Sequence, residues 1–363
     1  MIETCSILQN GEVEFVFCPA DYKELENFKL RDVYVFGTFT AWQKTDDFKL
    51  EKKDASGSKW TLVKKECEVS IPGNSGFPEF KFIVSAENSE IVADIYLNAP
   101  DENRGIKFLS NNIIPEEPFD AEAVINDEAF ALNVKSLEEF NLSSEQERAE
   151  ISNVRKVPGT TCLWRGYHPY KKSRALLDTE ETRIRIVNEM LEKNGVKSVI
   201  TLCGEEKPEA ALEEKIYPYM KKIQDAGGQL FVDTSYETVY FDSTSEEYVL
   251  TVQKIVRFIN SHPGAYYIHC RLGSDRTGTM SAVLAALCGA SWKEIAADYE
   301  RTRFMGIQEF RSARLLAYSL SRLLGEDVSR CSTLQKKTAS YFIKGGWLTE
   351  SEINTLVKKL TAK

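Results

Sequence analysis

The sequence lacks a long hydrophobic run and an excess of basic residues. Its most apolar stretch, residues 281–290 (SAVLAALCGA), is too short for the ~20 residues that a membrane-spanning helix requires. Lys and Arg number 46 against 55 Asp and Glu, which gives a net charge of −9. This balance argues against a nucleic-acid partner and against a polybasic membrane surface. We therefore expect no nucleic-acid ligand and no membrane span.

Cysteine and histidine are also sparse and scattered. The eight cysteines include no C-x-x-C pair, and the three histidines are His168, His262 and His269. This pattern fits neither a disulfide scaffold nor a zinc site, so we expect no metal and no cofactor. The first residues show neither the basic region nor the apolar run of a secretion signal. These absences favour a cytoplasmic protein, and they leave its oligomeric state open.

The length of 363 residues predicts two domains, and the composition changes along the chain. Residues 1–115 alternate short apolar segments with turn-forming ones, which predicts an all-β sandwich. Residues 116–154 form an acidic linker, in which residues 116–150 hold eleven acidic side chains against two basic ones. The linker therefore carries the whole net charge. It is either a flexible spacer or an acidic helix, and apolar residues such as Phe130 and Phe140 favour partial docking.

From residue 155 onward, apolar runs and amphipathic segments alternate. Strands are expected at residues 196–203, 230–232 and 266–269, and helices at residues 182–193, 212–226, 246–260 and 277–288. This order predicts an α/β domain with a mainly parallel sheet covered by helices on both faces. We place this domain at residues 155–328 and a helical C-terminal extension at residues 329–363.

The segment 269–278, HCRLGSDRTG, lies between an expected strand and an expected helix. Five residues separate Cys270 from Arg276, and they can curl so that their N–H groups surround an anion at the helix N-terminus. The positive field there favours a Cys270 thiolate that attacks phosphorus, and Arg276 can bind two phosphoryl oxygens. Thr277 or Ser274 can donate a hydroxyl to the sulfur. The expected phosphate-binding loop is Arg271, Leu272, Gly273, Ser274 and Asp275.

This loop resembles the signature of cysteine-dependent tyrosine and dual-specificity phosphatases, and the resemblance covers residues 157–325. Members of that family carry a general acid on a separate loop before the cysteine. Asp242, 28 residues upstream, is the expected acid, although it could instead cap a helix; Asp233, at 37 residues, is the alternative. Asp275 resembles the D-R-T of some phosphoinositide and bacterial phosphatases, and an acid there is expected to disfavour polyphosphates. Arg165, in LWRGYHP, is expected to be structural.

The N-terminal region shows a second ordered set of motifs: DVYVFGTFTAW (32–42), Trp60, EFKFIV (79–84) and FLSNNII (108–114). The set resembles the glycogen- and starch-binding, immunoglobulin-like modules of AMP-activated kinase β subunits and of some glucan phosphatases. The resemblance implies that Trp42 stacks on a sugar ring and that Lys81 and Asn111 contact the sugar. The second tryptophan of those modules is missing, and Tyr96 is the nearest aromatic residue. The alternative is that Trp42 and Trp60 are core residues and that the module contacts a protein.

Together these features resemble the laforin-like phosphoglucan phosphatases. They predict phosphomonoester hydrolysis through a phosphocysteine, with a phosphorylated glucan or a glycogen-associated phosphoprotein as substrate. The alternatives are a tyrosine phosphatase whose β module binds proteins, a phosphoinositide phosphatase, and a non-catalytic glucan-targeting scaffold. Cys203, which ends a neighbouring expected strand, is either a redox partner of Cys270 or a small buried side chain.

Overall fold

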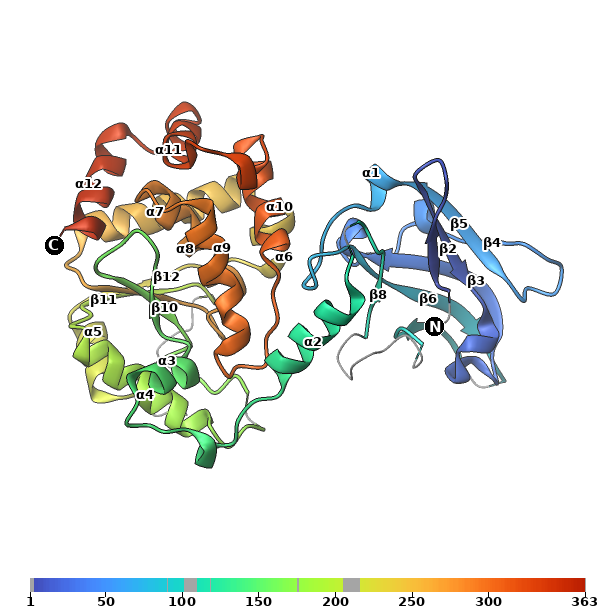
Figure 1. The fold of residues 1–363 in the computed structure, drawn as a ribbon, viewed down its shortest axis with the longest axis horizontal. Helices are drawn as coiled ribbons and strands as arrows, with labels where there is room; N and C mark the ends of the chain where they lie inside the picture. Colours follow the sequence, from blue (N-terminus) through green and yellow to red (C-terminus); the bar gives the residue numbers. More distant parts are fainter. Residues whose placement is uncertain are drawn as a thin grey trace. The chain divides into compact units, whose positions relative to one another are not determined.

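The computed structural model describes residues 3–89, 91–100, 110–117, 119–174, 176–204 and 216–362. It divides into two compact units, Met1–Ala129 and Phe130–Lys363, which are called unit 1 and unit 2 below (Figure 1). The boundary falls within the acidic segment. That segment contains two helices, α2 (Ala121–Leu132) and α3 (Glu145–Ser152). Within the described ranges, every helix is too short or too polar to cross a membrane.

Unit 1 contains two antiparallel sheets. One sheet has the order β1 (Cys5–Ile7), β2 (Glu12–Phe17), β5 (Trp60–Lys65) and β4 (Glu51–Lys52). The other has the order β3 (Lys29–Gly37), β6 (Glu79–Glu87) and β7 (Val92–Leu97), and β8 (Asn112–Ile113) also pairs with β6. A short helix, α1 (Glu66–Val69), follows β5.

Alternate residues of the strands place large side chains in one core shared by the two sheets of unit 1. Phe15 and Phe17 of β2 and Phe80 and Phe82 of β6 belong to this buried cluster, as does Trp60. Period-two alternation is what a half-buried strand produces. The expected all-β structure of this region is thus confirmed, and its strands form antiparallel sheets. The start of the FLSNNII motif, residues 108 and 109, lies outside the described residues.

Unit 2 is built on a five-stranded sheet with the order β12-β11-β13-β10-β9. Its strands are β9 (Arg155–Lys156), β10 (Leu163–Gly166), β11 (Ser198–Thr201), β12 (Gln229–Phe231) and β13 (Tyr266–His269). Strand β13 pairs in parallel with β10 and β11, β11 pairs in parallel with β12, and β9 runs antiparallel to β10 at the edge. The central strand therefore ends directly before Cys270.

Helices cover both faces of this sheet (Figure 1). Val199 and Tyr267 pack into a cluster with residues of α4 (Glu180–Lys193) and α5 (Pro218–Asp225). The adjacent residues Ile200 and Ile268 pack into the opposite cluster. Helices α7 (Glu246–Ser261), α8 (Asp275–Leu287), α9 (Trp292–Glu300), α10 (Ala313–Leu324), α11 (Leu334–Lys344) and α12 (Glu350–Thr361) contribute to that second cluster.

Several boundaries differ from those expected. The strand expected at residues 196–203 is shorter, and the helix expected at 277 begins at Asp275. The helix expected at 212–226 begins at Pro218, and residues 212–215 lie outside the described residues. A helix that the sequence did not predict, α6 (Tyr236–Phe241), follows β12. The carboxyl ends of the parallel strands lie at the same end of the sheet. The segments that follow β10, β11, β12 and β13 therefore converge at this carboxyl end of the sheet.

Candidate functional site

A cavity of about 470 Å³ lies at the carboxyl end of the parallel strands of the unit 2 sheet. The loop that follows β13 supplies Cys270, Arg271, Leu272, Asp275 and Arg276 to its lining. The segment after β10 adds Ser173 and Arg174, and the segment after β12 adds residues 233–236. Cys270 is 3% exposed, so its sulfur is shielded from bulk water and reached through this cavity.

The carbonyl groups of the loop are held by the surrounding scaffold. The carbonyls of Arg271, Leu272 and Gly273 accept hydrogen bonds from the backbone N–H of His168 (3.2 Å), from Asn153 Nδ2 (2.7 Å) and from Arg165 Nη2 (2.8 Å). The C=O and N–H groups that flank one peptide bond point in opposite directions. The N–H groups of the following residues therefore point away from these scaffold partners, an arrangement that can bind an anion.

The arginine that holds the loop is itself anchored by a buried ion pair. Arg165 Nη1 donates to Asp298 Oδ2 at 2.6 Å, and Arg155 Nε donates to Asp298 Oδ1 at 2.6 Å. Burial opposes ionisation of Asp298, but the two guanidinium groups outweigh it and hold its pKa below the usual value. The hydrogen bonds that Arg165 donates to the loop go to the backbone carbonyls of Gly273 and Ser274.

Gly273 occupies a place in the loop that no other residue fits. Its φ of +81° lies in the left-handed region, and a Cβ atom there would lie 2.3 Å from the carbonyl oxygen of Gly166. Side chains rarely adopt this backbone conformation, and real Cβ atoms do not approach backbone that closely. The close packing of the loop against the end of β10 therefore requires glycine.

Three hydroxyl groups near the cavity are buried and have no hydrogen-bond partner among the described residues: Thr234 Oγ1, Ser274 Oγ and Thr277 Oγ1. Ser274 and Thr277 are 1% and 0% exposed. Arg276 Nη1 donates to the Thr234 carbonyl at 3.3 Å, which ties the loop to the segment after β12. A buried hydroxyl without a partner is costly unless a ligand or a catalytic group uses it.

The structure separates the two candidate acids. Asp233 is exposed and lines the cavity beside Cys270. Asp242 is exposed at the C-terminal end of α6 and is not among the residues that line this cavity. Helix α6 lies between the two positions in the chain, and Asp242 follows its last residue. The number of residues between Asp242 and Cys270 gave no indication of that helix.

The third acid, Asp275, lies in the loop but is already paired. Its Oδ1 accepts hydrogen bonds from Tyr240 Oη (2.9 Å) and Arg311 Nε (2.7 Å), and its Oδ2 accepts from Arg311 Nη2 (3.1 Å). Sequence reasoning missed Tyr240 and Arg311, because each lies more than thirty residues from Asp275 along the chain, on another element. No local signal in the sequence links them to the loop.

One cluster of potential metal ligands lies beneath the loop. Ligand atoms of His168, Cys203 and His269 lie within 4.8 Å of one another. His168 Nδ1 accepts from two backbone N–H groups, and His269 Nε2 lies 2.9 Å from Thr201 Oγ1 while its Nδ1 lies 3.0 Å from the Cys270 carbonyl. Burial lowers the pKa of His269 to about 4 and that of His168 well below its ordinary value. Both histidines thus form hydrogen bonds with the surrounding backbone or with Thr201, as scaffold histidines do.

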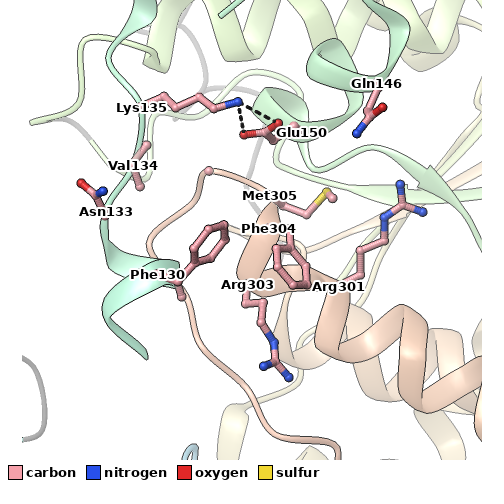
Figure 2. Close-up of a pocket in the computed structure, with 12 residues that line it drawn as sticks. Phe130, Asn133, Val134, Lys135, Gln146, Glu150, Arg301, Arg303, Phe304 and Met305 are labelled. Atoms are coloured by element: carbon pink, nitrogen blue, oxygen red, sulfur yellow. Dashed lines mark hydrogen bonds and ion pairs between the residues drawn. The ribbon is translucent and has the colours of Figure 1, made fainter. Parts of the chain in front are cut away.

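A second cavity of about 470 Å³ in unit 2 is shown in Figure 2. Phe130, Lys135, Glu150, Arg301 and Phe304 are among its lining residues. The amino group of Lys135 points at the Glu150 carboxylate, at 3.1 Å. Among the described residues, those that line it include no cysteine, serine or histidine. We therefore take the cavity beside Cys270 as the candidate active site.

The residues expected to bind sugar lie on unit 1. Trp42 packs against Phe36 of β3 at 5.5 Å between ring centroids, and Lys81 is the cross-strand partner of Phe36. Tyr96 of β7 lies 5.7 Å from the Phe36 ring and is 64% exposed. The structure thus brings Trp42, Lys81 and Tyr96 to one face of the sheet, opposite the core.

The third expected sugar contact, Asn111, is tied to the protein. Its Nδ2 donates to Glu79 Oε2 at 2.8 Å, and Glu79 is itself buried at the start of β6. Lys81 Nζ likewise donates to Asn98 Oδ1 at 2.8 Å. Trp60, by contrast, is 3% exposed in the core, and its Nε1 donates to the Gly57 carbonyl. The two tryptophans therefore have different surroundings.

Comparison with known proteins shows the family to which the chain belongs. No curated protein matches the chain. Among solved structures, the chain matches the core catalytic domain of the PP-IP phosphatase SIW14 from S. cerevisiae, determined in complex with citrate. The identity is 18% and the TM-score is 0.33, over 54% of this chain and 94% of that chain. The model of the tyrosine phosphatase family matches residues 139–361, which include the whole cavity beside Cys270. The chain therefore belongs to the tyrosine phosphatase family and is a cysteine-dependent phosphatase.

Proposed function

We propose that Cys270 is the nucleophile and that the loop from Arg271 to Asp275 binds the phosphoryl group of the substrate. The observation that supports this most directly is that scaffold groups bind three successive carbonyls of the loop, because the N–H groups on the other side of these peptides are then available to an anion. Such an arrangement stabilises a thiolate and the equatorial oxygens of a phosphoryl group alike. Arg276, at the start of α8, adds a bidentate cation.

The reaction has two steps. The Cys270 thiolate attacks phosphorus, a P–S bond forms, and the bond to the leaving oxygen breaks as an acid donates a proton to that oxygen. The resulting carboxylate then takes a proton from water, whose oxygen attacks phosphorus and releases inorganic phosphate and the thiolate. Thr277 and Ser274, whose buried hydroxyls have no partner among the described residues, can donate to the departing sulfur.

Asp233 is the acid that the cavity favours, since it lines the cavity and Asp242 does not. We expect Asp233→Asn to reduce kcat by about 10²–10³-fold for an alkyl or sugar phosphate, and much less for an aryl phosphate, whose leaving group needs little protonation. Asp242→Asn is the matched control and is expected to retain nearly full kcat. The reverse result would assign the acid to Asp242, and equal losses on both substrates would remove the role from either residue.

The substrate itself is a separate proposal. The rings of Trp42, which is partly exposed, and Tyr96, which is exposed, flank the buried ring of Phe36 and form an aromatic face with Lys81 beside it. This aromatic face favours α-glucan binding over the alternative in which Trp42 is a core residue. Flat aromatic side chains stack on the apolar faces of glucose rings. Sugar binding would raise the effective concentration of phosphorylated glucan, or of a glycogen-associated phosphoprotein, at the active site. A phosphotyrosine protein or a phosphoinositide remains the alternative substrate.

Co-sedimentation with amylopectin tests the binding, and phosphate release tests the substrate. We expect Trp42→Ala and Tyr96→Ala each to weaken co-sedimentation several-fold, while aryl phosphatase activity is unchanged. Ile91→Ala, which alters another exposed apolar residue of unit 1, is the control. No pull-down of the wild-type chain would remove the sugar proposal. Faster phosphate release from phosphopeptides or phosphoinositides than from phosphorylated amylopectin would move the substrate to that class.

A further inference from the structure

An acid within a phosphate-binding loop poses an electrostatic problem. Asp275 opens α8 next to Arg276 and lines the cavity where a phosphate dianion would bind. A free carboxylate there would repel that dianion and oppose the thiolate form of the nucleophile. Such a penalty would be largest for heavily charged substrates. The structure shows a cation placed against this carboxylate instead.

That cation is Arg311, which comes from the segment directly before α10. Its Nε and Nη2 bind the two oxygens of Asp275 at 2.7 and 3.1 Å, a bidentate arrangement. The Arg311 side chain is only 12% exposed, so solvent screens the pair weakly. Burial works against the guanidinium charge, but Asp275 and Glu309 outweigh it and hold the pKa of Arg311 well above its usual value.

The other groups that face Asp275 do not replace this charge. Tyr240 of α6 donates to Asp275, and its hydroxyl contacts that of Tyr299 of α9. Burial raises the pKa of both tyrosines, so they are neutral donors. Glu309 pairs with Arg311 and also with Arg174 of the cavity wall. Burial raises the pKa of Glu309, and the two arginines oppose that shift. With both acids ionised, the formal charges of Arg174, Glu309, Arg311 and Asp275 sum to zero.

We propose that Arg311 is the counter-ion of the phosphate-binding loop: it neutralises Asp275, so that a loop containing an acid still attracts a phosphate monoester dianion. This inference rests on the proposed role of the loop. Arg311 lines no part of the cavity and acts through Asp275, so it is a positioning and charge-balancing residue. Arg276 is then free of the neighbouring carboxylate and available to the substrate.

Charge-balanced variants of the full chain test the proposal through binding of inorganic phosphate. The readout is the protection of Cys270 from iodoacetamide, which does not depend on turnover. Arg311→Gln leaves the cluster with one net negative charge, so we expect phosphate to protect roughly tenfold less well. Arg311→Lys keeps the charge and is expected to protect within threefold of the wild type.

The double variant Arg311→Gln, Asp275→Asn restores neutrality and distinguishes charge from packing. We expect it to recover phosphate protection to within about threefold of the wild type, although it has lost two buried partners. Protection as poor as in Arg311→Gln alone would overturn the proposal, as would Arg311→Lys behaving like Arg311→Gln. If the wild type binds phosphate but hydrolyses no phosphoester, the proposed function fails while this inference is still decided by the protection data.

Discussion

The loop around Cys270 and the aromatic face of unit 1 present functional side chains in opposite ways. The loop is held from behind: Asn153, Arg165 and the His168 backbone bind its carbonyls, and each of these partners is buried. In the aromatic face, Trp42 and Tyr96 contact the ring of Phe36, and Tyr96 is 64% exposed. Reaction geometry requires backbone groups in fixed positions, whereas stacking on a sugar requires only an accessible flat surface. The two regions should therefore respond differently to substitution.

The largest expected effect is a difference in stability between variants of the two tryptophans of unit 1. Trp60→Ala removes a core side chain and should lower the free energy of unfolding of unit 1 by about 3–5 kcal/mol. Trp42→Ala, on the exposed face, should cost less than about 1.5 kcal/mol. Urea unfolding followed by hydrogen exchange in unit 1 measures both. Similar losses of stability in the two variants would mean that Trp42 is a core residue like Trp60.

A smaller but still large effect is expected in the loop. Gly273→Ala places a Cβ 2.3 Å from the Gly166 carbonyl at a φ of +81°, so the loop must move. We expect kcat/KM for an aryl phosphate to fall by about 10²–10³-fold, which is ~2.7–4 kcal/mol. Gly195→Ala is the matched control, because its φ is also positive (+62°) but nothing lies within 4 Å of its Cβ position. An unchanged kcat/KM in Gly273→Ala would show that the loop tolerates movement.

The two units are also expected to lose different amounts of stability at low pH, because all three histidines lie in unit 2. Burial lowers the pKa of His269 from 6.5 to about 4, so between these pH values the unfolded chain binds the proton and the folded chain does not. This difference in the pKa of His269 contributes up to ~3 kcal/mol to the free energy of unfolding. The contribution is fully present above pH 6.5 and is lost as the pH falls toward 4.

Hydrogen exchange at pH 7 and pH 4.5 measures this difference in each unit. We expect the free energy of local opening to drop more in unit 2 than in unit 1. His269→Asn should reduce the drop, since it removes one of the titrating groups. An equal drop in the two units, or an unaltered one in His269→Asn, would show that the histidines do not control acid stability.

Much of the candidate site is local in sequence and was predictable for that reason. The strand, the loop and the helix that carry Cys270 and Arg276 are consecutive, and their order follows from the apolar run of β13 and the spacing of HCRLGSDRTG. The antiparallel strands of unit 1 were likewise readable from period-two alternation. Boundaries were less accurate: α6 was missed because its six residues are too few to show helical periodicity.

The sequence by itself determined the chemistry of the loop, since a thiol, a guanidinium and backbone N–H groups need only seven consecutive residues to come together. Only the tertiary structure decided the charge around it. Arg311 meets Asp275 across 36 residues, and Asp233 rather than Asp242 lines the cavity because α6 lies between them. Such pairings depend on how separate elements pack, and packing geometry leaves no periodic or local trace in the sequence.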